Sequence, residues 1–94
     1  MFNSILVVCT GNICRSPIAE RFLQNLLPDR KIDSAGTGAL IAHSADESAV
    51  KVAGAYGLSL AGHKGRQFTS ALGRQYDLIL VMEKHHLEEV GRIA

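Results

Sequence analysis

The residues with the most evident chemistry lie close together near the N-terminus, in the segment CTGNICRS at positions 9–16. Cys9 supplies a thiol, which becomes a strong nucleophile when it loses its proton. Arg15 follows six residues later, and its planar guanidinium can hold two oxygens of a phosphate group at once. Gly11 lies between them and lets the backbone approach a ligand closely. The segment therefore predicts a loop that binds phosphate above a reactive sulfur.

The elements predicted on either side explain how such a loop would attract an anion. The continuous apolar run at residues 5–8 indicates a strand that is covered on both faces. Ser16 suits the cap of a helix and Pro17 its first turn, and Pro28 ends the helical pattern. In parallel sheets, ligands bind beyond the carboxyl ends of the strands, at the turn into the next helix. Cys9 falls at that turn, where free N–H groups and the helix dipole favour an anion.

The same positive surroundings should act on the thiol. The helix end and Arg15 favour the thiolate of Cys9, and Ser16 can donate a hydrogen bond to the sulfur. We expect covalent catalysis through a phosphocysteine, in which Arg15 and the loop amides stabilise the phosphoryl oxygens without a metal or another cofactor. The alternative is that Cys9 is a small core residue and Arg15 a surface charge. The position of the pair between a buried strand and a capped helix argues against it.

Cys14 and the histidines are the other side chains with redox or metal chemistry. Cys14 is either a packing residue or a neighbour that forms a reversible disulfide with Cys9 and shields it from over-oxidation. Zinc tolerates the four residues between these cysteines, but no matching second pair follows, so no metal site is expected. The scattered histidines are expected at the surface or in hydrogen bonds, with the two adjacent ones pointing in different directions: His43, His63, His85 and His86.

The middle of the chain continues the alternation of strands and helices. We expect a second strand at residues 31–35 and a glycine-containing loop at residues 34–43. Ser44, with Glu47 three residues later, fits a capping box that opens a helix, and Gly57 is a natural terminator for it.

The last third of the chain completes the pattern. A short helix near residues 70–76 precedes a strong apolar strand at residues 77–82, and residues 83–93 are predicted to form a helix. The order strand, helix, strand, helix, strand, helix implies an α/β fold, a parallel sheet with helices on both faces. We expect one domain over residues 1–94.

Composition and charge narrow the expected partners. Of the 94 residues, 47% are hydrophobic and 20% charged, which is typical of an ordinary globular domain. The net charge is +1 and no basic run occurs, so neither nucleic acid nor an anionic membrane is an expected partner. No apolar stretch reaches the roughly 18 residues that span a bilayer. The N-terminus lacks the cationic start and the apolar core of a signal peptide, so we expect a cytoplasmic protein.

The string CTGNICRSP at residues 9–17 resembles the signature of the low-molecular-weight protein tyrosine phosphatases. The resemblance continues in SAGT at residues 34–37, in the segment from Gly62-His63 to Arg66-Gln67, and in YDLILVME at residues 76–83. It implies the phosphotyrosine phosphatase I-like fold, with three strands here and four in the family. It also implies a protein tyrosine phosphatase that acts on phosphotyrosine in a protein substrate.

The resemblance assigns roles to individual residues. It implies Cys9 as the nucleophile and Arg15 as the phosphate clamp, while Asn12 and Ser16 hold the loop and the thiolate in place. His63 resembles a family histidine in the network that supports the loop. The phosphate-binding set besides the clamp is Thr10, Gly11, Asn12, Ile13, Cys14 and Ser16.

Leu40 marks a departure from many family members, which carry an aromatic residue in the loop beside the active site. An aliphatic residue there is similar to the bacterial members that are paired with tyrosine kinases of exopolysaccharide or capsule assembly. A phosphorylated kinase tail is therefore a candidate substrate.

The second departure concerns the general acid, which in the family is an aspartate in an Asp-Pro segment near the C-terminus. No Asp-Pro occurs in this sequence, and its aspartates are Asp29, Asp33, Asp46 and Asp77. For Asp46, helix capping is the simplest role. The fourth strand, the acid loop and the last helix of the family are missing too, so we expect a C-terminally truncated chain. Without the acid, poor leaving groups should react about 10² to 10⁴ times more slowly, and an incompletely covered sheet would favour self-association.

Two other classes use similar parts. Arsenate reductases have a similar loop on a similar fold, but they need further cysteines to carry electrons away, and none exists beyond Cys14. A catalytically impaired fragment that only binds phosphate or phosphotyrosine is the other alternative.

Overall fold

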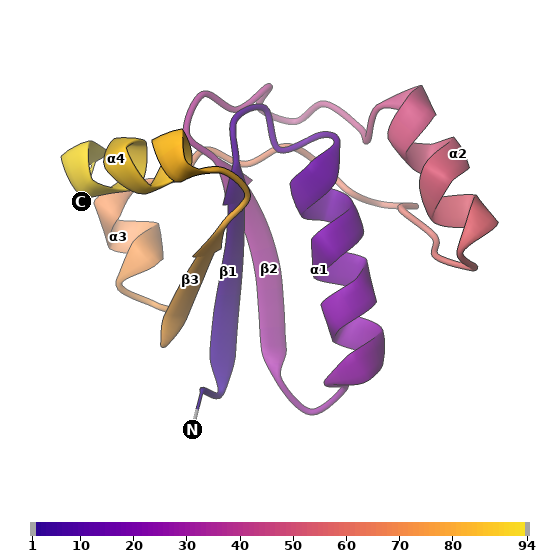
Figure 1. The fold of residues 1–94 in the computed structure, drawn as a ribbon, viewed down its shortest axis with the longest axis horizontal. Coiled ribbons are helices and arrows are strands. Elements are labelled where there is room, and N and C mark those ends of the chain that lie inside the picture. Colours follow the sequence, from indigo (N-terminus) through magenta and orange to yellow (C-terminus); the bar gives the residue numbers. More distant parts are fainter. Residues whose placement is uncertain (1, 94) are drawn as a thin grey trace.

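The computed structural model describes residues 2–93 and contains one parallel sheet of three strands in the order β2–β1–β3. The strands are β1 (Ser4–Cys9), β2 (Lys31–Gly36) and β3 (Leu78–Val81). The helices are α1 (Arg15–Leu26), α2 (Glu47–Ala55), α3 (Ser70–Gly73) and α4 (Lys84–Ile93). In Figure 1, α1 lies on one side of the sheet and α3 and α4 on the other, while α2 lies beyond α1. The predicted α/β class with helices on both faces is confirmed.

The central strand β1 carries the core because it pairs with a neighbour on both edges. Leu6, Val7 and Val8 are fully buried, and alternate side chains point to opposite faces. Val7 packs with Ile5 and Ile32 against α1, whereas Leu6 and Val8 form the cluster on the other face, with Phe68, Tyr76 and side chains of α3 and α4. The continuous apolar run therefore reflects a strand buried on both faces, as predicted.

Helix α1 begins two residues earlier than its sequence pattern predicts. Its N-cap is Cys14, whose side chain makes no capping bond, and Ser16 lies inside the first turn, fully buried. The expectation that Ser16 caps the helix is wrong, because its hydroxyl is bonded to the sulfur of Cys9 instead.

The cap of α2 also differs from the prediction. Asp46, rather than Ser44, is the N-cap, and its carboxylate accepts a hydrogen bond from the Ser48 N–H at 3.0 Å. The loop favours this choice because the N–H of Asp46 donates to the Ile13 carbonyl, which places Asp46 where the helix begins. Gly57 ends the helix as predicted: at φ +74° it allows paired bonds of the Schellman type back into the last turn.

The carboxyl end of β2 is where three segments of the chain meet. Gly36 pairs with Cys9 in the sheet and forms a bridge with Gln67 on its other side. A Cβ atom on Gly36 would lie 2.2 Å from the carbonyl oxygen of Thr10, so glycine is required for this approach. The loop that follows β1 is thereby held against the segment before α3.

No helix within residues 2–93 has the length and apolar character needed to cross a membrane.

Candidate active site

The segment from Cys9 to Ser16 turns from the end of β1 into α1, at the same end of the sheet as the start of α4 (Figure 1). A cavity of about 240 Å³ opens on this loop. The structure thus brings most of the predicted site together in one place, since the lining residues are Cys9, Thr10, Gly11, Ile13, Cys14 and Arg15.

Cys9 lies at the base of the loop and is only 4% exposed. The Ser16 hydroxyl oxygen lies 2.8 Å from it, and the backbone N–H of Asn12 donates to it at 3.3 Å. The side-chain amide of Asn12 donates to the Ser16 oxygen at 2.9 Å, so the hydroxyl proton of Ser16 is free to point at the sulfur. Two hydrogen-bond donors can therefore converge on the sulfur.

Asn12 holds the shape of the loop and is fully buried. Its backbone has φ +59°, a left-handed conformation that asparagine adopts more readily than most residues. Its side-chain amide also donates to the Ser34 hydroxyl at 2.9 Å, and its side-chain oxygen accepts from the Arg66 N–H at 2.8 Å. Nε2 of His63, a buried ring, lies 2.6 Å from the Asn12 carbonyl oxygen and must donate to it.

Ser34 and Glu20 extend this network and were not among the predicted site residues. The Ser34 hydroxyl donates to Glu20 at 2.8 Å, and Arg21 donates to the other carboxylate oxygen at 2.9 Å. Glu20 is 7% exposed, so a buried carboxylate with two donors terminates the chain of bonds that begins at Cys9. Ser34 belongs to the SAGT string, which was a signal in the sequence, whereas nothing in the helical pattern distinguishes Glu20.

Arg15 lies at the rim of the cavity with about half of its side chain exposed, and it forms an ion pair with Glu83, the residue before α4. The bond to Arg15 and its positive charge lower the pKa of the Glu83 carboxyl. Both partners are solvated, so the pair orients the guanidinium more than it stabilises the fold.

Behind the loop, α4 contributes a histidine that is fully buried, His86. Its Nε2 lies 2.9 Å from the Thr10 hydroxyl oxygen, and its Nδ1 accepts from the Glu83 N–H at 3.0 Å. His85 beside it is exposed and lies 3.4 Å from the Glu83 carboxylate. Within residues 2–93, the ring nitrogens of these histidines and a Glu89 oxygen lie within 4.8 Å of one another. Both nitrogens of His86 already have hydrogen-bond partners, so this group is not arranged to receive a metal ion.

The other predicted side chains lie around the loop. Leu40 is 45% exposed and its N–H donates to the Gly11 carbonyl at 3.0 Å, but its side chain does not line the cavity of about 240 Å³. Cys14 is exposed, and both cysteines are free thiols. Partial burial, followed by the charges of Asp46 and Cys9, raises the pKa of the Cys14 thiol.

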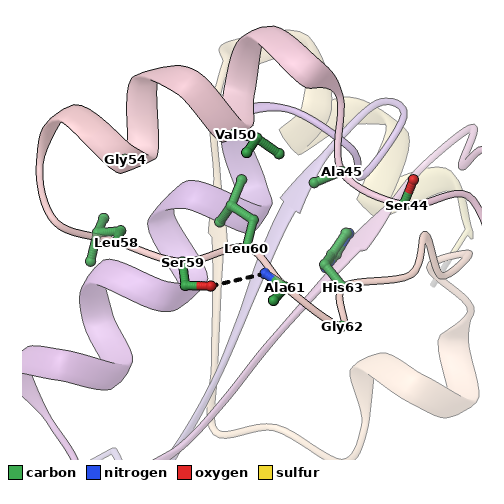
Figure 2. A pocket seen from close by; sticks show the side chains of 10 residues that line it. All are labelled: Ser44, Ala45, Val50, Gly54, Leu58, Ser59, Leu60, Ala61, Gly62 and His63. Carbon is green, nitrogen blue, oxygen red and sulfur yellow. Dashed lines mark hydrogen bonds between the residues drawn. The ribbon is translucent and has the colours of Figure 1, made fainter.

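A larger cavity lies elsewhere, between α2 and the segment before His63, and measures about 470 Å³ (Figure 2). Its wall is mainly apolar, with Val50, Leu58 and Leu60 pointing toward it. Among the residues that line it, only His63 belongs to the network around Cys9, so this cavity lies apart from the reactive sulfur.

Comparison with known proteins identifies the class to which this fold and site belong. The family model described as "Low molecular weight phosphotyrosine protein phosphatase" matches residues 4–94. The chain belongs to this family, as the string at residues 9–17 predicted.

Relatives support the same assignment. The chain is 66% identical over 94 residues to a putative low molecular weight protein-tyrosine-phosphatase of Klebsiella pneumoniae, covering all of this chain and 65% of the relative. It is 57% identical over 93 residues to Etp of Escherichia coli K12, a low molecular weight protein-tyrosine-phosphatase of which it covers 63%.

Among solved structures, the tyrosine phosphatase Wzb from Escherichia coli K30 in complex with sulphate superposes with a TM-score of 0.98. It is 68% identical, and the match covers all of this chain and 66% of that one. The tyrosine phosphatase AmsI of Erwinia amylovora superposes with a TM-score of 0.96 at 57% identity, with 99% of this chain and 62% of that chain covered. The chain therefore spans a little under two thirds of the length of these relatives.

Proposed function

We propose that this chain is the phosphate-binding and nucleophilic part of a protein tyrosine phosphatase that hydrolyses phosphotyrosine through a phosphocysteine. The observation that carries the proposal is the position of the Cys9 sulfur, held by Ser16 and the Asn12 N–H at the base of a loop that ends in Arg15. Residues 1–94 would form one domain that contains this half of the machinery.

Substrate binding would use the loop as an anion receptor. The N–H groups of the loop and the start of α1 favour the phosphate group, and Arg15 would hold two of its oxygens. The Arg15 guanidinium forms an ion pair with the Glu83 carboxylate, so a bound phosphate would compete with Glu83 for Arg15. Thr10, Gly11, Ile13 and Cys14 would contribute the remaining loop backbone around the phosphate.

The first chemical step would transfer the phosphoryl group to Cys9. The sulfur attacks phosphorus, an S–P bond forms, the ester P–O bond breaks, and the electron pair leaves on the tyrosine oxygen. Arg15 and the loop amides stabilise the charge on the equatorial oxygens. In the second step water attacks phosphorus, the S–P bond breaks, and the electron pair returns to the sulfur, which the Ser16 hydroxyl stabilises.

Proton donation to the leaving tyrosine would be the weak point of this chain. Each aspartate is engaged in another contact. Asp46 caps α2, and Asp33 accepts a hydrogen bond from Tyr76. The other two lie near the opposite end of the sheet, where Asp29 bonds with Arg30 and Asp77 accepts from the Asn3 N–H. The tyrosine oxygen would then take its proton from water. We expect a loss of about 10² to 10⁴ in rate for phosphotyrosine, and a smaller loss for phenols that are more acidic.

The substrate that we propose is a phosphotyrosine segment of a protein, with a bacterial tyrosine kinase as the candidate. The exposed apolar side chains of Leu40 and Ile41, in the loop whose backbone contacts Gly11, would contact the aromatic ring. A cytoplasmic location would keep Cys9 reduced, as a thiol nucleophile requires. Self-association, which we also propose, would use apolar side chains that α1 exposes, such as Phe22 and Leu26.

Rapid-quench measurements with p-nitrophenyl phosphate test the proposal. We expect a burst of p-nitrophenol and one phosphoryl group attached to Cys9, detected by mass spectrometry after acid quenching. Cys9→Ser should show neither while still binding inorganic phosphate. If the wild-type chain binds phosphate but forms no phosphocysteine, and its turnover equals that of Cys9→Ser, the chain is a phosphate binder and the catalytic proposal is wrong.

A further inference from the structure

We propose that His86 is a positioning residue that fixes the phosphate-binding loop from α4, through the hydroxyl of Thr10 and the backbone of Glu83. The inference rests on the proposed function of the loop, and it concerns a residue for which neither the Cys9-to-Ser16 motif nor the resemblance implied a role. His86 is fully buried and lies 76 residues from Thr10 along the chain.

The hydrogen bonds of His86 identify its protonation state. A backbone N–H can only donate, so Nδ1 of His86 must be an unprotonated acceptor for the Glu83 N–H at 3.0 Å. The proton of the neutral ring is then on Nε2, which donates to the Thr10 hydroxyl oxygen at 2.9 Å. His86 is the third residue of α4 and reaches back to the N–H of the residue before the helix. It occupies the position that glutamate or glutamine takes in a capping box.

These two bonds act near both ends of the loop. Thr10 follows Cys9 directly, and its carbonyl accepts from the Gly38 N–H at 3.0 Å, so the bond to His86 fixes the side chain of a residue whose backbone is already held. At the other end, the carboxylate of Glu83 pairs with Arg15. Because His86 also bonds the backbone of Glu83, its buried ring connects Thr10, the residue after the nucleophile, with Glu83, the residue that pairs with Arg15.

A second contact joins α4 to the segment after β2, which in turn bonds to the end of β1. Glu89 accepts from the Thr37 hydroxyl at 2.9 Å, and the Thr37 N–H donates to the Cys9 carbonyl at 2.9 Å. The start of α4 therefore has little freedom to move away from the loop, and the position of Thr10 follows the position of His86.

Acid should weaken this arrangement. The charged and titratable groups around His86 are Glu83 just before α4, His85 and Glu89 from α4, and Arg15 from α1. The neighbouring loop side chains are the hydroxyls of Thr10 and Thr37. Burial, together with His85 and Arg15, lowers the pKa of His86 and outweighs the two carboxylates. The ring is thus neutral at pH 7. Protonation at lower pH would place an N–H at Nδ1 against the Glu83 N–H and break that bond.

Two pairs of variants test this inference by the dissociation constant of inorganic phosphate, measured by calorimetry, and by kcat and KM for p-nitrophenyl phosphate. His86→Phe keeps a ring without nitrogens, whereas His86→Gln keeps a donor and an acceptor but cannot titrate. Thr10→Val removes the hydroxyl with little change of shape, and Thr10→Ser keeps it. Glu88→Gln, at an exposed position of the same helix, is the matched control, with an expected change of less than about twofold.

We expect His86→Phe and Thr10→Val each to weaken phosphate binding about five- to tenfold, the effect of losing one or two hydrogen bonds. The double variant should be no worse than His86→Phe alone, because both changes remove the same bond. His86→Gln and Thr10→Ser should bind within about threefold of wild type. The ratio of the phosphate affinity of wild type to that of His86→Gln should fall as the pH drops below the ordinary histidine pKa of about 6.5, because only the wild-type ring can take up a proton. Taking this ratio removes the effect of the ionisation of phosphate itself.

The outcomes separate this inference from the proposed function. If Thr10→Val and His86→Phe bind phosphate as wild type does, or if their effects add fully in the double variant, the inference is wrong even when wild type forms a phosphocysteine. If wild type forms no phosphocysteine, the proposed catalysis fails, and phosphate binding still tests His86. If His86→Phe does not fold, ¹⁵N NMR of the wild-type protein at pH 7 can show which nitrogen of the His86 ring carries the proton. A proton on Nε2 supports the inference, and a proton on Nδ1 contradicts the assigned bonds.

Discussion

At the scale of single residues, the site depends on how each buried polar atom finds a partner. Within residues 2–93, no buried side-chain nitrogen or oxygen lacks a hydrogen-bond partner. The side chain of Asn12 donates to the hydroxyl oxygens of Ser16 and Ser34 and accepts from the Arg66 N–H. Because an unpaired buried group costs about 1 to 3 kcal/mol, removal of any member leaves its neighbours destabilised. These bonds therefore fix the shape of the loop in the absence of a ligand.

Tyr76 gives a prediction at this scale. Its hydroxyl donates to Asp33 at 2.6 Å, and burial followed by this bond raises its pKa to about 12. Since the pKa is higher in the folded state, the stabilisation is complete below the unfolded value near 10 and is lost as the pH rises toward 12. Tyr76→Phe should lower the free energy of unfolding by about 1 to 2 kcal/mol at pH 7.

Urea unfolding of both proteins at pH 7 and at pH 10.5 measures this effect. The difference between wild type and Tyr76→Phe should shrink at the higher pH. Tyr56→Phe is the control, because Tyr56 is 79% exposed and its hydroxyl should contribute nothing measurable. An equal difference at both pH values would show that the hydrogen bond to Asp33 is not the source of the effect.

At the scale of elements, the ends of the helices determine where the functional side chains lie. The start of α1 is free of a side-chain cap, which leaves its N–H groups available for an anion. The start of α2 is capped by Asp46, whose own N–H donates to the Ile13 carbonyl at 2.8 Å. The cap of α2 thereby also anchors the phosphate-binding loop.

Two substitutions test which residue caps α2: Ser44, as the sequence pattern predicts, or Asp46, as the structure shows. Asp46→Ala should lower the free energy of unfolding by about 1 kcal/mol, because the Ser48 N–H loses its acceptor. Ser44→Ala should change it by less than about 0.5 kcal/mol, because Ser44 is exposed and precedes the helix by several residues. Thermal unfolding followed by circular dichroism measures both, and a larger effect for Ser44→Ala would restore the capping box at Ser44.

At the scale of the whole molecule, the site exists where the loop after β1, the end of β2 and the segment before α3 converge. Gly36 is the point of closest approach. Gly36→Ala should displace Thr10 and weaken phosphate binding at least tenfold, with a loss of about 1 to 3 kcal/mol in stability from overpacking. Gly54→Ala is the matched control: no atom lies within 4 Å of its added Cβ on α2, so it should leave binding unchanged and stabilise the helix by about 0.5 to 1 kcal/mol.

Calorimetric titration with inorganic phosphate measures the affinity of both glycine variants, and urea unfolding measures their free energy of unfolding. Wild-type affinity in a folded Gly36→Ala protein would mean that the approach to Thr10 does not position the loop.

The sequence by itself was sufficient for features that local patterns encode. The strand at residues 5–8, the loop from Cys9 to Ser16 and the helix after it are contiguous, so their order could be read from local patterns alone. The order of elements predicted the parallel sheet, and the loop string predicted the family. Helix caps were less certain because Ser44 and Asp46 are both good caps, and only the bond of Asp46 to Ile13 decides between them.

Only the tertiary structure revealed the residues that hold the loop from a distance. Glu20, Ser34 and His86 reach the site from three different elements, and the bonds that connect them span 14, 22 and 76 residues of sequence. No periodicity of strands or helices encodes which buried polar side chains meet, because that depends on how the elements pack. The motif at residues 9–16 thus predicted the chemistry that we propose for the site, whereas the fold determined which partners hold Cys9 and Arg15 in place.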